Sequence, residues 1–312
     1  MKLGWNKNVA NQIKGLHALF MNNQPVQQLS PYKLVLFSTI LLLACVSLSL
    51  VLMKSGLNQA WMLNIHAAPV LPAWFWALIN LGGDAWVILL ILLLIERFPG
   101  EITSWVLKTW LIGAVVSQLI KNTLPMPRPA SVLGVENLSI IDHPPLLSGS
   151  MPSGHALAAI SCALIVCTVL KRRGIQNAYL WLIALVAGIA AWARVAVGAH
   201  WPSDVIAGAG LAFSVVALAF LWERHSSWNA WFQRTRGGVF LIALHILISL
   251  HLATPQSDFF FVQFIQFNLA FISLMRAMFL VKKYFSRRSQ WKRFLKNEVH
   301  HFWEAIWTPC SH

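Results

Sequence analysis

The chain has 312 residues, of which 57% are hydrophobic and 11% are charged, and its formal net charge is +14. A soluble domain carries about a quarter of charged residues, so this composition excludes an ordinary soluble protein and indicates a polytopic membrane protein. The charge does not indicate nucleic-acid binding, because the basic residues are not gathered on one soluble face among aromatic residues. They lie in short loops and in the tails, which favours contact with anionic lipid headgroups.

Eight apolar segments approach or reach the roughly 20 residues needed to cross a bilayer. The first follows an N-terminal tail, residues 1–33, that lacks the apolar core of a signal peptide. The second is interrupted by the sequence LGGDAW, so we expect its outer end to be irregular. Residues 55–73, between these two, are expected to lie along the outer surface. The predicted spans are 34–53, 75–95, 102–120, 155–170, 177–193, 204–222, 238–254 and 259–281.

These spans predict an all-α, polytopic transmembrane bundle with a six-span core, residues 34–222, and two additional spans in residues 223–281. Residues 282–312 form a basic tail with aromatic residues at roughly helical spacing. This spacing predicts an amphipathic helix on the inner leaflet, and a simple topology anchor is the alternative. The cysteines show no CxxC pair and no metal-ligand spacing, so we interpret them as small core residues. They are Cys45, Cys162, Cys167 and Cys310.

Charge asymmetry predicts the orientation of the chain. When both termini are cytoplasmic, nearly all basic loop and tail residues lie on the inner side, as the positive-inside rule requires. Lys108 and Arg276 fall within spans, and we expect them to snorkel to the inner surface. Four basic residues remain on the outer side, namely Lys54, Lys121, Arg128 and Arg194. Three of these stand near histidines, prolines and glycines at span ends, which indicates a function beyond topology.

Three outer segments contain the polar residues that require an explanation: KNTLPMPRP (121–129), PSGH (152–155) and ARVAVGAHWPSD (193–204). The predicted topology brings their side chains to one face of the membrane. The set consists of Lys121, Arg128, Ser153, His155, Arg194, His200 and Asp204. Three cations with a single firmly placed carboxylate predict a bound anion, and guanidinium groups suit the oxygens of a phosphate. The helix after PSGH would add amide donors at its N-terminus, where Gly154 permits a close approach.

Two imidazoles beside a phosphate allow catalysis as well as binding. A neutral imidazole can attack phosphorus, while a protonated imidazole can give a proton to the leaving oxygen. Asp204 follows His200 by four residues, near enough to hold one ring nitrogen and to orient the other. The three cations would stabilise the charge of the transition state, so we expect neither a metal nor another cofactor.

These residues resemble the three-part signature of the type 2 phosphatidic acid phosphatase (PAP2) superfamily, and the resemblance covers the six-span core. The matching parts are Lys121-x6-Arg128-Pro129, Pro152-Ser153-Gly154-His155 and Arg194-x5-His200-x3-Asp204. The resemblance implies that His200 is the nucleophile that forms a phosphohistidine, that Asp204 orients it, and that His155 is the general acid. It also implies that the phosphate is held by Lys121, Arg128, Ser153, Gly154 and Arg194. Ala193 departs from the pattern, which usually has serine there, and the signature does not explain the last two spans.

The resemblance implies a multi-pass lipid phosphatase of a bacterial inner membrane, with a periplasmic active site. The substrate would be a membrane lipid phosphate or diphosphate, such as undecaprenyl diphosphate, a lipid A-type phosphate or phosphatidylglycerol phosphate. A lipid phosphotransferase with the same intermediate is one alternative. A lipid transporter or flippase without phosphatase chemistry is another, although a transporter should show a polar route through the bilayer. The oligomeric state stays open.

Three further polar residues are not included in the expected site. His245 and His251 are six residues apart and do not share a helical face, so we expect core or interface histidines. Asp84 follows Gly82 and Gly83 and would either face the outer site or end a helix.

Overall fold

The computed structural model describes residues 30–96, 100–142, 149–226 and 228–285. Within these ranges the chain forms helices and no strands, which confirms the all-α prediction. Among the described residues, seven helices are long and apolar enough to cross a membrane, and a bent helix pair brings the number to eight when it is counted as one span. The protein is therefore a multi-pass membrane protein. Most of the N-terminal and C-terminal tails lies outside the described residues, and so does nearly all of the predicted amphipathic helix of residues 282–312.

Each predicted span corresponds to one long helix or to the bent pair. The seven long helices are α2 (Pro31–Lys54), α6 (Thr103–Thr123), α8 (Gly154–Arg172), α9 (Asn177–Ala196), α10 (Pro202–His225), α12 (Thr235–Ala253) and α13 (Phe260–Phe285). The bent pair is α4 (Ala73–Gly82) and α5 (Ala85–Ile95). Four short elements complete the described chain, namely α3 (Leu57–Ala67), α7 (Pro129–Leu133), η1 (Val135–Asn137) and α11 (Asn229–Phe232).

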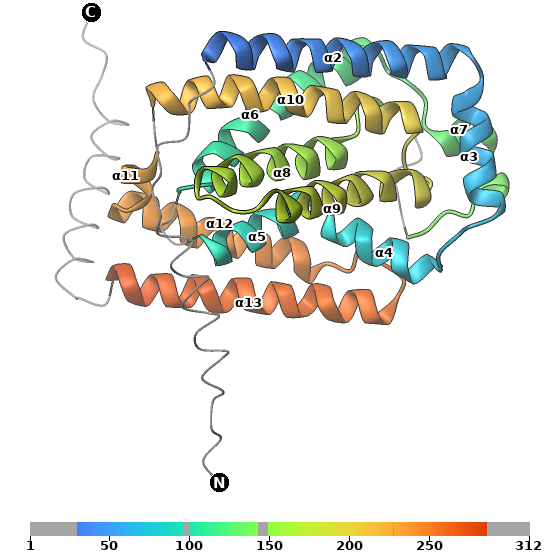
Figure 1. The fold of residues 1–312 in the computed structure, drawn as a ribbon. Coiled ribbons are helices and arrows are strands. Elements are labelled where there is room, and N and C mark those ends of the chain that lie inside the picture. The colour runs from blue at the N-terminus through green and yellow to red at the C-terminus, as the bar shows by residue number, and fades with distance from the viewer. Residues whose placement is uncertain (1–29, 97–99, 143–148, 227, 286–312) are drawn as a thin grey trace, which may run out of the picture.

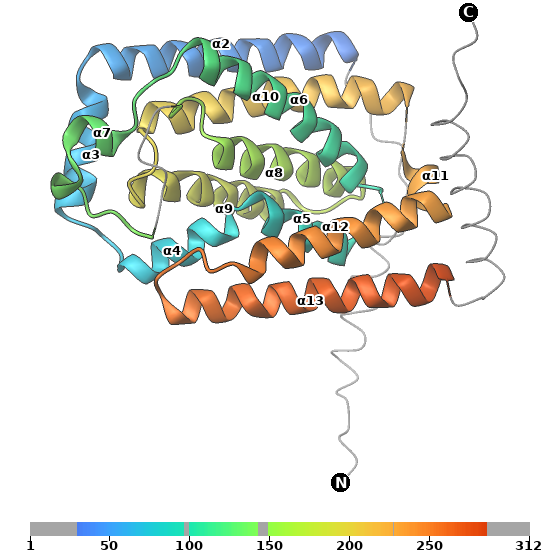
Figure 2. The same cartoon turned by 180° about the vertical axis from the view of Figure 1, so that it is seen from behind.

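Helix α10 packs against α2, α6, α8 and α9, and α12 packs along α13. Figures 1 and 2 show these long helices running side by side, with α3 and α7 at one end of the bundle and α11 at the other. Small residues permit the close contacts of α10. A Cβ atom on Gly208 would lie 2.5 Å from the carbonyl oxygen of Ser153, and one on Gly210 would lie 2.5 Å from the Cβ of Cys45.

The second span is broken in its middle, whereas we expected irregularity at its outer end. Helices α4 and α5 are bent by 58° relative to each other. Asp84 begins α5, and its Oδ1 accepts hydrogen bonds from the backbone N–H groups of Trp86 at 2.8 Å and Val87 at 3.3 Å. A Cβ atom on Gly83 would lie 3.2 Å from the carbonyl oxygen of Ala190. The break therefore brings the turn between α4 and α5 close to α9.

Lys108 is buried and paired, so the prediction that it snorkels is wrong. Its side chain is 0% exposed, and its ammonium lies 2.5 Å from the Oε2 of Glu223. The same ammonium donates to the carbonyl oxygen of Ser226 and lies 4.7 Å from the centre of the Trp228 ring. An unpaired buried charge costs several kcal/mol, and these partners at the end of α10 offset that cost. The pair fastens α6 to α10 at the end of the bundle that contains α11.

Candidate active site

The eight expected site residues all lie at the end of the bundle that contains α3 and α7. Helices α6 and α9 end there, and helices α8 and α10 begin there. Lys121 is in the last turn of α6, Arg194 is in the last turn of α9, and Arg128 immediately precedes α7. Ser153 caps α8, which begins with Gly154 and His155, while His200 and Asp204 flank the start of α10. Three chain segments, residues 121–129, 152–155 and 193–204, thus supply one layer of side chains.

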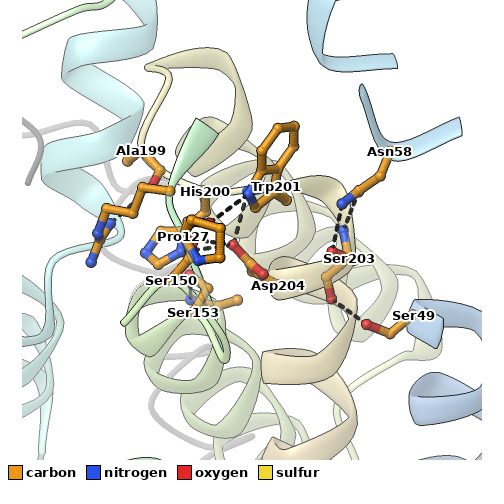
Figure 3. A network of polar contacts seen from close by, with 12 residues as sticks. Ser49, Asn58, Pro127, Ser150, Ser153, Ala199, His200, Trp201, Ser203 and Asp204 are labelled. Carbon is orange, nitrogen blue, oxygen red and sulfur yellow. Dashed lines mark hydrogen bonds and ion pairs between the residues drawn. The ribbon is translucent and has the colours of Figure 1, made fainter. Parts of the chain in front are cut away.

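His200 and Asp204 form a buried pair at the start of α10. The Nδ1 of His200 lies 3.4 Å from the Oδ2 of Asp204, and both side chains are almost fully buried. Asp204 Oδ2 also accepts hydrogen bonds from the backbone N–H of Trp201, at 2.9 Å, and from the hydroxyl of Ser150. Figure 3 shows these contacts converging on the carboxylate. Because Nδ1 faces Asp204, Nε2 is the ring nitrogen that is left for another partner.

The sequence HWPSD explains this local geometry. Pro202 occupies the first turn of α10, where its missing N–H is not needed. Asp204, in the third helical position, accepts from the backbone N–H of Trp201, which precedes the helix. The Asp204 carboxylate therefore caps the N-terminus of α10 and also faces the imidazole of His200. This dual role accounts for the spacing of four residues between His200 and Asp204.

Burial lowers the pKa of His200 to about 4. The guanidinium groups of Arg194 and Arg128 lower it further, while the hydrogen bond to Asp204 and the charge of that carboxylate oppose the shift. Burial also lowers the pKa of Arg128, and the Asp204 charge again opposes the shift. The neutral imidazole, which is the nucleophilic form, is therefore the dominant form of His200 at neutral pH.

Arg128 and Arg194 are each only 7% exposed. Each uses one guanidinium donor within the protein: Arg128 Nη1 donates to the carbonyl oxygen of Ala199 at 2.8 Å, and Arg194 Nη1 donates to Asn80 Oδ1 at 2.6 Å. The Nε of each arginine is buried and has no hydrogen-bond partner. A buried donor without a partner costs about 1–3 kcal/mol. Both guanidinium groups therefore keep donors for a ligand with negatively charged oxygens.

Lys121 and His155 complete the group of expected site residues. The ammonium of Lys121 interacts electrostatically with Arg128, Arg194 and Asp204. His155 interacts in the same way with Arg194, His200 and Lys121. The structure thus brings both histidines and all three cations into one electrostatically coupled group, which is the arrangement that we expected from the topology.

Ser153 and Gly154 contribute the start of α8. Ser153 is fully buried, its Oγ accepts from the N–H of Ala156 at 3.4 Å, and its own N–H donates to the carbonyl oxygen of Asp204 at 3.0 Å. The hydroxyl hydrogen of Ser153 stays available, because a hydroxyl that accepts can still donate. Apart from its chain neighbours and the backbone of its own helix, no protein atom would lie within 4 Å of a Cβ on Gly154. The surroundings of Gly154 are therefore open on the side where a ligand would approach the helix N-terminus.

Several polar residues support the site although their spacing in the sequence did not reveal them. Asn80 holds Arg194, and Ser150 holds Asp204. Asn58 of α3 bonds twice to Ser203, with its Nδ2 donating to Ser203 Oγ at 2.9 Å and its Oδ1 accepting from Ser203 N at 3.1 Å. The hydroxyl of Ser49 donates to the carbonyl oxygen of Ser203 at 2.9 Å. The contacts of Asn58 and Ser49 fix the first turn of α10. Ser49 and Asn80 are polar residues within apolar runs, which is the sequence signal that could have found them.

The fold and this cluster define an integral membrane protein with cationic and imidazole side chains gathered at one end of its bundle. Residues 102–228 match the model of the PAP2 superfamily. All eight expected site residues lie within the matched region. Helices α2 to α5, α12 and α13 lie outside it.

Two known proteins are similar to parts of the chain. An undecaprenyl-diphosphatase of Sulfolobus acidocaldarius is 28% identical over 124 residues, which are 39% of this chain and 56% of that protein. The matched region therefore spans little more than half of the relative's length. The crystal structure of Aquifex aeolicus LpxE superimposes with a TM-score of 0.44 and 26% identity, and it covers 53% of this chain and 95% of that chain.

Proposed function

We propose that this protein is a membrane phosphatase that hydrolyses a lipid phosphate or diphosphate through a phosphohistidine on His200. One observation carries the proposal. Two buried guanidinium groups, on Arg128 and Arg194, each keep an unpartnered Nε–H beside the His200–Asp204 pair. A phosphoryl group supplies the charged oxygens that these donors need, and the imidazole supplies the nucleophile. The match of residues 102–228 to the PAP2 superfamily supports the same reaction class.

In the first step, the Nε2 lone pair of His200 forms a bond to phosphorus. The bond from phosphorus to the leaving oxygen breaks, and that oxygen takes the electron pair and a proton from His155. Asp204 faces Nδ1 of the ring and stabilises the positive charge that the imidazole acquires. Lys121, Arg128 and Arg194 stabilise the charge on the phosphoryl oxygens, as metal ions do in other phosphoryl-transfer enzymes. We therefore propose that the reaction needs no metal ion.

In the second step, water attacks the phosphorus of the phosphohistidine. His155, which lost its proton in the first step, accepts a proton from this water. The bond between phosphorus and Nε2 breaks, its electron pair returns to the ring, and inorganic phosphate leaves. Ser153 and the N-terminal amides of α8 hold the phosphoryl oxygens through both steps, because a helix N-terminus favours an anion.

A lipid substrate suits the position of the site. The cluster lies at the end of a bundle whose helices expose many large apolar side chains, among them Leu36, Phe37 and Ile40 of α2. A lipid can keep its tail in the bilayer while its headgroup reaches the end of the bundle. We propose undecaprenyl diphosphate, a lipid A-type phosphate or phosphatidylglycerol phosphate as the substrate, and the name of the Sulfolobus relative supports the first.

We also propose that the site faces the periplasm of a bacterial inner membrane. The opposite end of the bundle holds Lys171, Arg172 and Arg173 at the end of α8, together with Lys282 and Lys283 at the end of α13. Cytoplasmic ends of membrane helices carry such an excess of basic residues. Val70 is 91% exposed in the connection after α3. A cysteine at this position, in a variant without the native cysteines, should react with a membrane-impermeant thiol reagent added to spheroplasts.

The decisive experiment measures inorganic phosphate released from a panel of lipid phosphates by the purified full-length protein in EDTA. We expect release by the wild type and its loss in His200→Ala, with radiolabel from the lipid phosphate trapped on the wild type alone. His225→Ala is the matched control, because His225 is exposed at the opposite end of α10. Release that survives His200→Ala would remove the proposed nucleophile. Label recovered in a second lipid would indicate a phosphotransferase, and lipid movement in vesicles without release would indicate a transporter.

A further inference from the structure

The hairpin formed by α12 and α13 lies outside the region that matches the PAP2 superfamily. We propose that this hairpin holds two carboxylates, Asp84 and Asp142, beside Arg194 and thereby limits how tightly the site retains phosphate. The inference rests on the proposed function, because it takes Arg194 to be a ligand of the phosphate. It assigns to the hairpin a role in product release.

Asp84 reaches the site through the break between α4 and α5. One turn before it, Asn80 accepts the hydrogen bond from Arg194 Nη1 at 2.6 Å. Its neighbour Gly83 packs against Ala190, which is one turn before Arg194 on α9. The break therefore sets the Asp84 carboxylate beside the last turn of α9. This carboxylate is only 13% exposed.

The hairpin contacts Asp84 through His251, in the last turn of α12. The Nε2 of His251 lies 3.7 Å from Asp84 Oδ2 and also 2.8 Å from Gln256 Nε2. The ring of His251 lies against that of Trp86, with 5.4 Å between the centroids and an angle of 35° between the planes. We expected His251 to be a core or interface histidine. Its position shows an interface histidine whose partner is a carboxylate near the site.

Asp142 interacts electrostatically with Arg194 from the loop before α8. Ile141, its neighbour, donates from its backbone N–H to the carbonyl oxygen of Val197 at 3.3 Å, just after α9 ends. The loop between α12 and α13 fixes the Asp142 carboxylate. Its Oδ1 accepts from the hydroxyl of Ser257 at 2.7 Å and from the backbone N–H of Asp258 at 3.2 Å. Asp142 has φ 60°, a left-handed conformation that aspartate tolerates better than most residues.

The charges of Asp84 and Asp142 act on Arg194. Both carboxylates interact electrostatically with its guanidinium, whereas Arg128 repels it. Lys121, Arg128 and Arg194 together would hold a phosphate dianion strongly in a poorly solvated site. A product that binds this tightly slows turnover, because interactions shared by the ground state and the transition state do not accelerate the chemical step. Two nearby carboxylates weaken the binding of any anion, and thus favour the release of inorganic phosphate.

Two conservative variants test the proposal in the full-length protein. Asp84→Asn keeps an N-cap acceptor for α5, and Asp142→Asn keeps a side chain of the same size. We expect each to bind radiolabelled inorganic phosphate about threefold more tightly or better, since one opposing charge near the anion is lost. Ser257→Ala should shift the affinity in the same direction by less, because it frees the Asp142 carboxylate to turn toward water. Glu136→Gln is the control, because it removes a carboxylate whose partner is Asn137, and its phosphate affinity should equal that of the wild type.

The outcomes separate this inference from the proposed function. Phosphate affinity that is unchanged or weaker in Asp84→Asn and Asp142→Asn would overturn the inference, because carboxylates that only orient Arg194 should strengthen phosphate binding. The same result with lipid phosphate hydrolysis intact in the wild type would leave the proposed function standing. Conversely, tighter phosphate binding in both variants of a protein that hydrolyses no lipid phosphate would show that the two carboxylates weaken anion binding, but it would remove the proposed function and, with it, the role in product release.

Discussion

The Nδ1 of His200 lies 3.4 Å from the Oδ2 of Asp204, and both side chains are almost fully buried at the start of α10. The oxygen that faces the ring also accepts the backbone N–H of Trp201 and the hydroxyl of Ser150. Asp204 is therefore held by its own helix and by the loop before α8. A carboxylate that is fixed in this way can fix an imidazole, which leaves the Nε2 of His200 for the attack on phosphorus that we propose.

Asp204→Asn should lower kcat by about 10²- to 10⁴-fold, because an amide can stabilise the wrong tautomer of His200 and cannot stabilise its positive charge. Steady-state hydrolysis of a lipid phosphate measures this effect. Ser150→Ala should lower kcat by about tenfold or less, because it removes one neutral hydrogen-bond donor to Asp204 and keeps the carboxylate. An Asp204→Asn enzyme with the turnover of the wild type would contradict the orienting role.

Arg194→Lys and Arg128→Lys should each lower kcat/KM by about 10- to 100-fold, although the charge is conserved. Lysine lacks the planar fork that keeps one donor on a protein oxygen and offers others to phosphate. Arg172→Lys is the matched control, because Arg172 lies at the opposite end of α8, where its guanidinium faces the ring of Phe220 at 5.4 Å. Equal kcat/KM values in all three variants would show that only net charge matters at the site.

Gly208→Ala should lower both stability and activity. Its Cβ would lie 2.5 Å from the carbonyl oxygen of Ser153, and a backbone atom cannot move aside as a flexible side chain can. Overpacking of this kind costs about 1–3 kcal/mol, and the resulting shift of α8 would displace Ser153. Gly188→Ala is the control, because no atom lies within 4 Å of a Cβ there, and alanine favours a helix by about 0.5–1 kcal/mol. Thermal unfolding in detergent, together with phosphate release, should separate the two variants.

The pH dependence of kcat/KM should show its acidic limb near pH 4, where the neutral form of His200 is lost. The folded pKa of His200, about 4, lies below its ordinary value of 6.5. The acidic limb of kcat/KM reports the pKa of an essential group in the free enzyme. An acidic limb near pH 6.5 would contradict the burial of His200 as a neutral nucleophile.

The same pKa predicts how stability varies with pH. Between pH 6.5 and about 4, the unfolded chain binds a proton that the folded His200 does not bind. The contribution of His200 to stability is therefore complete above pH 6.5 and decreases as the pH falls through this window. A His200→Gln variant should lose less stability than the wild type over this range, as measured by its unfolding midpoint.

The apolar spans, the three polar segments and their position at one end of the bundle could be predicted because each depends on local information. An apolar run of sufficient length must lie in lipid, loop charges set the orientation, and Ser153 and Asp204 stand where helices α8 and α10 begin. The proposed nature of the site rests on the residue types within these segments. None of these inferences required knowledge of which helix packs against which.

The tertiary structure alone decided which partners hold the site. Arg194 bonds to Asn80, 114 residues away, and Asp142 bonds to Ser257, 115 residues away. The break at Gly83, the burial of Lys108 against Glu223 and the contact of His251 with Asp84 also depend on packing between distant helices. Hydropathy and charge assign a segment to the membrane and a side, but they leave its neighbours and rotation open, because lipid is as apolar as the helices themselves. Close packing and the need to pair buried polar groups then select one arrangement.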